Sequence, residues 1–499
     1  MRINSSKENE LEKENVSFDT KVPTSSEEPW EELSDDHKQY LTDKHGTYKL
    51  DPIPSINDED PLNWPVGVKA IQLGMLSFHA FSTTFMAAGV IPSFATLLEE
   101  FGTSVSACSY FTSTQILVLG IFPLLWVPFM NKYGRLQLLI LSALGSCVFN
   151  IGCIFSDNYR DLMICRIFGA FFVSPAIAVG GGVVSELTFS HQLGWWTGWW
   201  VVGVTLGTHV GPFLMGFVQY QTGDTKYTFV VFAIMNFLQF FGYLTLGKET
   251  VYNSKIYTKS INSLFKIRPK TECDLNLAVI LSPIKCINKP KVVIPAIAYS
   301  VSFCYANVAC GVELTSLFHE KFNFNPQQIG LQFLSLILGC ILGEQIGGWV
   351  SDLWMKYYFH FKKSEKTIED RLWLSYLGFI IAIVGLIIYG VLLGNITDNK
   401  WRFGPLVGLC LASFGLQIIT TILVTYAIDS NPSNASNIAL FITVVRQVFG
   451  FVGPFYFPVM LENPNLGIKS TYGILAGLVA AFGLIPIALL HSSRYLGKH

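Results

Sequence analysis

Charged residues are scarce in this chain. Only 14% of its 499 residues are Asp, Glu, Lys or Arg, whereas soluble domains average about 25%. The mean hydropathy is +0.43, and several long stretches carry no charge at all. This composition excludes an ordinary soluble protein. The net charge of -1 gives no reason to expect a nucleic-acid partner.

Motifs for metals, disulfides and enzymatic chemistry are also missing. The ten cysteines include no CxxC pair and no His/Cys cluster with metal-ligand spacing, and most of them fall in apolar segments. No nucleophile–base–acid set occurs either. We therefore expect no metal, no cofactor and no enzyme. The first 65 residues are polar and rich in Pro and Ser, so we expect no cleavable signal peptide and a tail that stays in the cytosol.

Apolar segments long enough to cross a bilayer are what the chain does contain. A spanning helix needs roughly twenty apolar residues. By this measure, twelve spans are predicted near residues 69–92, 106–130, 135–156, 161–186, 194–218, 227–247, 292–317, 327–351, 372–394, 403–428, 436–461 and 470–490.

The break between Lys248 and Lys291 is the longest in this region, and it divides the spans six and six. We therefore predict an all-α polytopic membrane protein with twelve transmembrane helices in two halves. The predicted parts are a largely disordered cytosolic tail (1–68), an N-terminal half (69–247), a cytosolic central loop (248–291), a C-terminal half (292–490) and a cytosolic C-terminal tail (491–499).

The distribution of basic residues predicts the orientation. With the N-terminus in the cytosol, 26 of the 34 Lys and Arg residues lie inside and six lie outside. This asymmetry follows the positive-inside rule. It predicts that both termini are cytosolic.

A weak internal repeat and two glycine stripes link the halves. Val210-Gly211-Pro212-Phe213 and Val452-Gly453-Pro454-Phe455 each fall in the fifth span of a half. Glycine also recurs at every fourth position in span five (Gly203, Gly207, Gly211) and in span eight (Gly339, Gly343, Gly347). Such stripes let helix backbones approach closely. We expect the two stripes to face each other across the two halves.

Several motifs resemble one known family. Gly207, Gly211, Pro212 and Gly216 resemble the span-five motif of the drug:proton antiporters in the major facilitator superfamily. Leu162, Arg166 and Gly169 resemble their span-four motif. The loop Asn131–Arg135 resembles their loop between spans two and three in degenerate form, and its second-half equivalent keeps the acid at Asp352.

The segment Asp60-Pro61-Leu62-Asn63-Trp64-Pro65 is similar to a fungal branch of that family, which contains multidrug exporters and a polyamine and cation transporter. The resemblance implies the major facilitator fold, coupling to protons, and a substrate site between the two halves near the midplane.

Few charged residues lie within the predicted spans. Arg166, Arg446, Glu313 and Glu344 are well inside, whereas Glu186 and Asp429 sit at helix ends and are interpreted as interfacial. A charge inside the membrane costs roughly 2.5–3.5 kcal/mol on insertion scales, so it needs a partner or a function. Two readings stay open for Glu313 and Glu344: a fixed or snorkelling charge, or a site where a cation and a proton compete.

Titratable and polar residues complete the candidate site. Relatives in the family pair a span-one acid with the span-four arginine, but span one here offers only His79, and span five offers His209. Each histidine either titrates or simply completes a hydrogen-bond network. Further candidates for the substrate pocket are Tyr305, Asn307, Gln332 and Tyr426.

These features predict a proton-coupled transporter of small organic molecules, cationic or amphipathic, that works by alternating access. Export of drugs and uptake of a polyamine-type cation stay open as alternatives, as does a nutrient symporter of another class. A transporter-like sensor is disfavoured because the C-terminal tail is short. We expect a monomer in the plasma membrane whose partners are its substrate, protons and lipid.

Overall fold

The computed structural model describes Trp30, residues 33–252, Pro269, and residues 275–362 and 368–496. The chain divides into two compact units, Met1–Ile56 and Asn57–His499. In the first unit, helix α1 spans Asp35–His45, and the Ser34 side chain accepts a hydrogen bond from the His37 backbone N–H at its start. Residues 1–29, 31 and 32 of the predicted tail lie outside the described residues.

The described part of the second unit contains helices and no strands. The helices of its N-terminal half are α2 (Val66–Ala88), η2 (Ile91–Ser93), α3 (Phe94–Phe101), α4 (Val105–Ile121), α5 (Pro123–Tyr133), α6 (Arg135–Ile154), α7 (Tyr159–Val173), α8 (Pro175–Leu187), α9 (Ser190–Thr222) and α10 (Lys226–Leu246).

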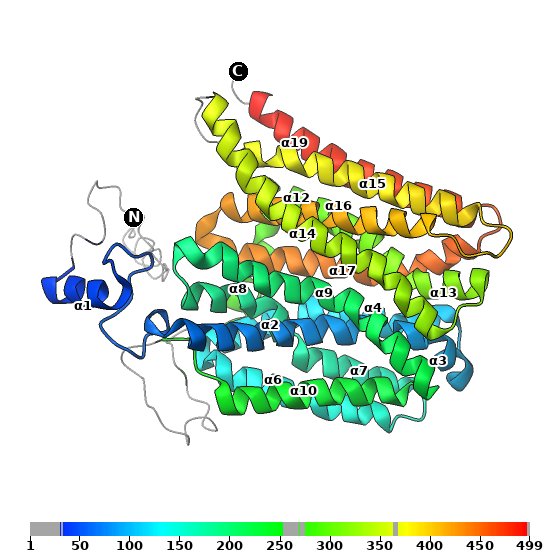
Figure 1. The fold of residues 1–499 in the computed structure, drawn as a ribbon, viewed down its shortest axis with the longest axis horizontal. Helices are drawn as coiled ribbons and strands as arrows, with labels where there is room; N and C mark the ends of the chain where they lie inside the picture. Colours follow the sequence, from blue (N-terminus) through cyan, green and yellow to red (C-terminus); the bar gives the residue numbers. More distant parts are fainter. Residues whose placement is uncertain (1–29, 31–32, 253–268, 270–274, 363–367, 497–499) are drawn as a thin grey trace, which may run out of the picture. The chain divides into compact units, whose positions relative to one another are not determined.

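A short connecting region, α11 (Leu277–Ile280) and η4 (Ser282–Asn288), leads to the C-terminal half. The helices of that half are α12 (Pro290–Phe303), η5 (Cys304–Ala309), α13 (Cys310–Phe322), α14 (Pro326–Lys362), η6 (Ile368–Leu372), α15 (Trp373–Gly394), α16 (Gly404–Asp429), η7 (Pro432–Asn434), α17 (Ala435–Glu462), α18 (Gly467–Val479), η8 (Ala480–Leu484) and α19 (Ile485–Leu496). The long helices lie side by side along one direction (Figure 1).

Within the described residues, eleven helical segments are long and apolar enough to span a membrane, and the pair α4–α5 supplies a twelfth. The prediction of an all-helical polytopic fold is therefore confirmed. Span two differs from the expected single helix because it bends by 42° between Ile121 and Pro123. Proline lacks the backbone N–H that would continue the helical ladder, and its ring crowds the preceding turn.

The outer surface of the bundle is apolar. Phe237, Phe241, Ile380 and Leu489 are each more than half exposed, an arrangement that suits contact with lipid and not with water. Polar side chains such as Asn236 are instead buried among the helices. The protein is therefore an integral membrane protein.

The two glycine stripes pack within the halves and do not face each other, so that expectation is wrong. In span five, a Cβ atom on Gly207 would lie 2.1 Å from the Thr84 Oγ1 atom of α2, and one on Gly211 would lie 2.6 Å from the Phe85 carbonyl oxygen. Gly203 meets α2 in the same way. The stripe thus joins α9 to α2, because only glycine permits this approach.

The span-eight stripe joins α14 to α16. A Cβ atom on Gly339 would lie 2.3 Å from the Cys410 carbonyl oxygen, and one on Gly343 would lie 2.6 Å from the Phe414 carbonyl oxygen. Gly347 packs more loosely on Ile418. The sequence identified tightly packed helix faces but not the helices that they contact.

Two close contacts between the halves lie at one end of the bundle. We call the end at which α2 begins the near end and the opposite one the far end. At the far end, Gly216 of α9 and Gly330 of α14 meet, and a Cβ atom on either would lie 3.1–3.3 Å from the other's backbone Cα atom. Pro212 lies in the same contact, with its carbonyl oxygen 3.2 Å from the Cβ position of Gly330.

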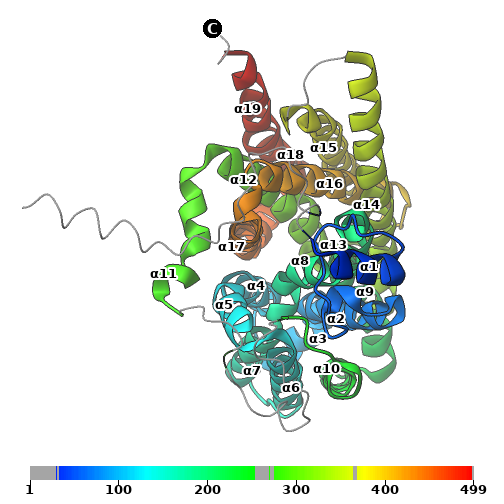
Figure 2. The same ribbon diagram turned by 90° about the vertical axis from the view of Figure 1, so that its left-hand side faces the viewer.

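A second far-end contact joins α4 to α17, where the rings of Tyr110 and Phe455 stack with centroids 4.5 Å apart. This contact pairs span two with span eleven across the two halves. Toward the near end, α9 and α14 diverge, as two perpendicular views show (Figures 1 and 2). The halves thus join at the far end and separate on one side toward the near end.

A Gly330→Leu substitution is expected to weaken far-end closure, because the larger side chain has no space against the backbone of α9. Hydrogen exchange of the α9 and α14 termini should increase at the far end, while the protein stays in the membrane. Gly74→Leu is the matched control, since a Cβ atom there meets nothing within 4 Å. Equal exchange in both variants would contradict the assigned contact.

Candidate functional site

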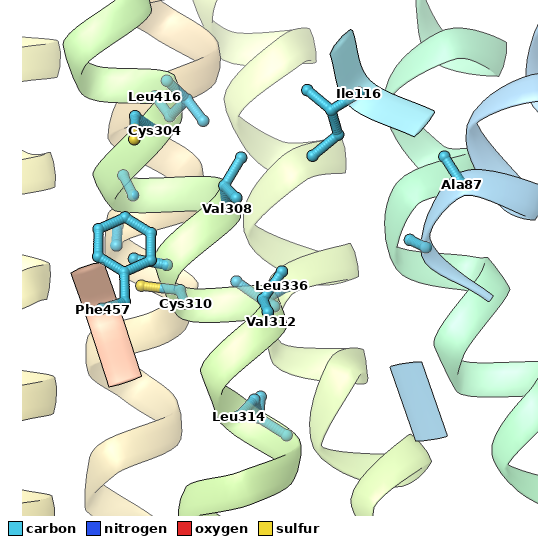
Figure 3. Packing of buried hydrophobic residues seen from close by; sticks show 14 of the residues in the cluster. Ala87, Ile116, Cys304, Val308, Cys310, Val312, Leu314, Leu336, Leu416 and Phe457 are labelled. Carbon is cyan, nitrogen blue, oxygen red and sulfur yellow. The ribbon is translucent and has the colours of Figure 1, made fainter. Parts of the chain in front are cut away.

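A cavity lies between the two halves and encloses about 830 Å³ of empty space, including space open to solvent. Apolar residues from both halves face it; Figure 3 shows Val308 and Val312 on the side of their helix that faces Ile116 and Ala87. Its polar lining residues are Thr84, Thr112, Thr205, Thr208, His209, Tyr299, Asn307, Gln417, Thr420, Arg446 and Gln447. A concave site with apolar walls and a small number of polar groups suits a small organic molecule.

A π-helix shapes the wall contributed by span seven. Residues Cys304–Ala309 form η5 between α12 and α13, and the wider turn places the adjacent residues Asn307 and Val308 both on the cavity. Phe303 and Gly311 extend the same wall. Such π-bulges are rare and are often found at functional sites.

Arg446 of α17 is the cationic residue of the described lining. Its Nη1 atom donates a hydrogen bond to the Tyr299 hydroxyl at 2.9 Å. Its guanidinium lies 5.7 Å from the ring centre of Tyr299 and 5.0 Å from that of Phe303. Its Nε atom has no hydrogen-bond partner, and no ion pair forms with any described carboxylate. The guanidinium therefore keeps donor capacity for a ligand.

Uncharged polar atoms of the lining also lack partners among the described residues. They are Thr112 Oγ1, Gln417 Oε1 and Gln447 Oε1. Unpaired buried polar atoms are unfavourable, so they indicate a surface that is completed by a ligand or by water. The lining contains no carboxylate among the described residues.

Three of the predicted pocket residues line this cavity: Arg446, His209 and Asn307. The sequence analysis missed Tyr299, Gln417 and Gln447 together with the threonines. An uncharged amide side chain within an otherwise apolar span is the sequence feature that could have identified Gln417 and Gln447 as candidates. That signal does not say which face of the helix is turned to the cavity.

Arg166 is buried inside the N-terminal half and does not line the cavity. Its Nη1 atom donates to the Met86 carbonyl oxygen at 3.1 Å, and its Nη2 atom donates to the Phe111 carbonyl oxygen at 3.2 Å. The Gln115 side chain donates a hydrogen bond to the backbone carbonyl oxygen of Arg166 at 2.7 Å. Arg166 therefore ties span four to spans one and two through backbone carbonyls. The geometry assigns it a packing role in this conformation.

His79 also lies within the N-terminal half. It is fully buried, and its Nδ1 atom lies 3.2 Å from the Tyr243 hydroxyl of α10. This contact agrees with the interpretation of a histidine within a hydrogen-bond network. His79 is absent from the cavity wall.

The other three predicted pocket residues do not line this cavity. The Tyr305 hydroxyl accepts a hydrogen bond from Tyr456 at 3.2 Å, inside the C-terminal half. Gln332 accepts a hydrogen bond from the Trp401 Nε1 atom at 3.2 Å near the far end. Tyr426 is completely buried in α16. Each of these helices turns a different face to the cavity.

The two intramembrane glutamates occupy different places. Glu313 is only 3% exposed, and its Oε2 atom accepts a hydrogen bond from the Ser316 hydroxyl at 3.3 Å. Glu344 lies on α14 one turn from Cys340, toward the near end. Neither lines the cavity or forms an ion pair with a described residue. Neither glutamate is therefore held in a fixed ion pair by a described residue, Arg446 included.

Ion pairs do occur at the near end, where they join helix termini. Arg135 at the start of α6 pairs with Glu186 at the end of α8. Arg371 before α15 pairs with Asp429 at the end of α16, at 3.1 Å. The two pairs occupy corresponding positions in the two halves, and they agree with the interfacial interpretation of Glu186 and Asp429. The side chain of Asp352 lies outside the described part of the chain.

The family follows from comparison with known sequences. A family model described as the Major Facilitator Superfamily matches residues 76–454, which cover both halves and the cavity. The chain belongs to the Major Facilitator Superfamily.

Members of this superfamily from filamentous fungi are similar over most of their length. The efflux pump radE of Floropilus chiversii is 26% identical over 454 residues, covering 88% of this chain and 83% of that protein. The efflux pump vrtL of Penicillium aethiopicum is 25% identical over 458 residues and covers 87% of each.

Solved structures show the same fold. The xylose transporter XylE from E. coli, in a partially occluded inward open conformation, matches with a TM-score of 0.58 and 13% identity, covering 83% of this chain and 97% of that one. A bacterial homologue of the human lysosomal transporter Spinster, in an inward-facing and unoccupied conformation, matches with a TM-score of 0.61 and 13% identity, covering 87% and 99%. The protein is a major facilitator membrane transporter and not an enzyme.

Proposed function

We propose that this transporter exports small amphipathic organic molecules that carry hydrogen-bond acceptors or a negative charge, in exchange for protons. The observation that carries the proposal is Arg446, whose Nε atom has no partner and whose cavity contains no described carboxylate. Around it, Tyr299, Phe303 and the valines of span seven offer apolar contact. The lining thus favours the amphipathic class of the sequence expectation over the cationic class.

Electrostatics separates these two classes. Two like charges about 4 Å apart repel by roughly 4 kcal/mol at the effective dielectric of a protein surface. A cation beside Arg446 meets that repulsion without a carboxylate to offset it. An acceptor or an anion gains a charge-assisted hydrogen bond there instead.

The direction of transport is inferred from the relatives. The halves meet at the far end through Gly216 and Gly330, and the charge asymmetry predicts that the near end faces the cytosol. The cavity is therefore approached from the cytosol in this conformation, and alternating access opens the same site to the other side in turn. The relatives named as efflux pumps support export, and a plasma-membrane location fits this role.

Transport in proteoliposomes tests the proposal. Vesicles holding a pH gradient of either sign should accumulate fluorescein, an anionic probe, in one direction only. A rhodamine ester of similar ring structure, but with a positive charge, should move at least about tenfold more slowly, which corresponds to about 1.4 kcal/mol of discrimination. Preference for the rhodamine ester would overturn the substrate class. Equal accumulation of fluorescein with and without a pH gradient would overturn proton coupling.

The second candidate function is transport of an organic cation, and Glu344 is the residue that supports it. Its Oε2 atom is buried without a hydrogen-bond partner, and its helix neighbour Cys340 contacts the cavity residue Gln417. If cations are transported, Glu344→Gln should reduce uptake of the rhodamine ester and leave fluorescein unchanged. Glu320→Gln, on the exposed far end of α13, is the control. We expect no selective loss in either variant.

A further inference from the structure

The side of span seven that faces away from the cavity carries a buried acid. Gly311 and Val312 of α13 line the cavity, and Glu313 is the next residue. Consecutive residues of an α-helix are about 100° apart around its axis, so Glu313 turns toward the interior of the C-terminal half. The same helix therefore carries the wall of the cavity on one face and an ionisable group on another.

The surroundings of Glu313 hold two buried tyrosines. Tyr389 of α15 and Tyr472 of α18 are within electrostatic range of its carboxyl group. They are 0% and 1% exposed, and their rings meet edge to face with centroids 4.7 Å apart. The two tyrosine hydroxyls interact with each other, whereas the Glu313 Oε1 atom has no hydrogen-bond partner among the described residues. The interior of the C-terminal half thus holds a buried carboxyl group within electrostatic range of a buried tyrosine pair, and one oxygen of that carboxyl group has unused hydrogen-bonding capacity.

No cation balances this carboxyl group among the described residues. The charged group that acts on it from α17 is another acid, Glu462. On its own helix, Lys321 donates to the carbonyl oxygens of Leu393 and Ile396. Cys310, on the same helix, adds a thiol. An ionised carboxylate without a counter-ion is strongly disfavoured in such a site, whereas a neutral carboxyl group both donates and accepts hydrogen bonds.

Span seven also contains a segment about which α13 can rotate. The π-helix η5 ends at Ala309, directly before α13, and a π-turn can be relieved or shifted by small rotations. A rotation of α13 would move Gly311 and Val312 in the cavity wall together with Glu313. Binding of a proton on one face and of substrate on the other would then be linked reciprocally.

We propose that Glu313 is the proton-binding residue of the transport cycle and that it acts outside the substrate cavity, in a pocket with Tyr389 and Tyr472. The inference rests on the proposed proton-coupled function. In this conformation Glu313 holds the proton as a neutral carboxyl group. In the alternate conformation the pocket opens to water, the O–H bond breaks, and the carboxylate releases one proton to solvent. Tyr389 and Tyr472 are positioning residues for the neutral form.

The first test is spectroscopic and needs no substrate. Infrared difference spectra of the purified protein in lipid nanodiscs, recorded across neutral pH, should contain a protonated carboxyl band. That band should disappear in Glu313→Gln and persist in Glu320→Gln, a matched variant on the same helix. A wild-type band that survives unchanged in Glu313→Gln overturns the proposal.

The second test separates coupling from binding. For one proton per cycle, a gradient of one pH unit accumulates a probe about tenfold. Glu313→Gln should reduce the fluorescein accumulation to about onefold, while exchange of fluorescein without a gradient stays within about twofold of wild type. Tyr472→Phe, which keeps the acid, should shift the pH profile of accumulation without abolishing exchange.

The outcomes distinguish the two levels of the claim. If the wild-type protein accumulates no probe under a gradient, the proposed function fails and the inference fails with it. If the wild type accumulates fluorescein and Glu313→Gln does so equally well, the proposed function stands and only the role of Glu313 is overturned.

Discussion

An Arg446→Ala variant is expected to lose binding of fluorescein by roughly ten- to hundredfold, because a hydrogen bond to a charged group contributes about 1.5–3 kcal/mol. The guanidinium has a free Nε donor, and its Nη1 atom is oriented by the Tyr299 hydroxyl at 2.9 Å. Removing it leaves the acceptor of the ligand unpaired in a largely apolar cavity. Fluorescence anisotropy of the probe with purified protein measures the loss directly.

Two companion variants show whether the geometry of Arg446 matters. Arg446→Lys keeps the charge but not the planar fork of donors, so its affinity should lie between those of wild type and Arg446→Ala. Tyr299→Phe removes the hydroxyl that orients the guanidinium and should have a smaller effect. Unchanged affinity in Arg446→Ala would remove the central support for the proposed substrate class.

An Arg166→Ala variant is expected to lose stability before it loses a specific step of transport. Arg166 is 2% exposed and holds the carbonyl groups of Met86 and Phe111. Losing two hydrogen bonds from a charged donor destabilises the N-terminal half by roughly 3 kcal/mol or more. The melting temperature of the protein in detergent and its yield in membranes should both fall. Arg166→Lys should not restore them, because one ammonium group does not reproduce the two-pronged contact.

Arg160 provides the matched control for this change. It lies on the same helix, α7, and is exposed, so Arg160→Ala should leave the melting temperature unchanged. A stable Arg166→Ala protein that binds probe normally, yet fails to couple it to protons, would contradict the packing role. Such a result would restore the coupling role that the family resemblance implies for the span-four arginine.

The spans were predictable because the requirement behind them is local. A helix that crosses a bilayer needs an apolar length, and that length is legible in the chain. The break after Ile121 was not predicted, although Pro123 stands there, because membrane helices tolerate proline when neighbouring helices compensate for it. The π-helix at Cys304–Ala309 has no marker in the sequence that we recognise.

The orientation of side chains was predictable only in part, because it depends on the partner helix. The stripe at Gly203, Gly207 and Gly211 indicates a close contact, but α2 and α14 are equally possible partners from the sequence alone. Glu313 has the same ambiguity: its neighbour Val312 faces the cavity while Glu313 faces Tyr389 and Tyr472. Arg446 was identified because charge in a span is rare. Gln417 and Gln447 carry only the weaker signal of an uncharged amide in an apolar span.

Cross-linking the far end tests alternating access through this cavity most directly. Tyr110 and Phe455 come from opposite halves, and their rings stack 4.5 Å apart. A Tyr110→Cys/Phe455→Cys protein, joined by a short reagent that reacts with two thiols and is cleaved by reductant, is held closed at that end. We expect fluorescein transport in proteoliposomes to stop on cross-linking and to return on cleavage, with each single variant unaffected by the reagent. Full transport by the cross-linked protein would contradict the account.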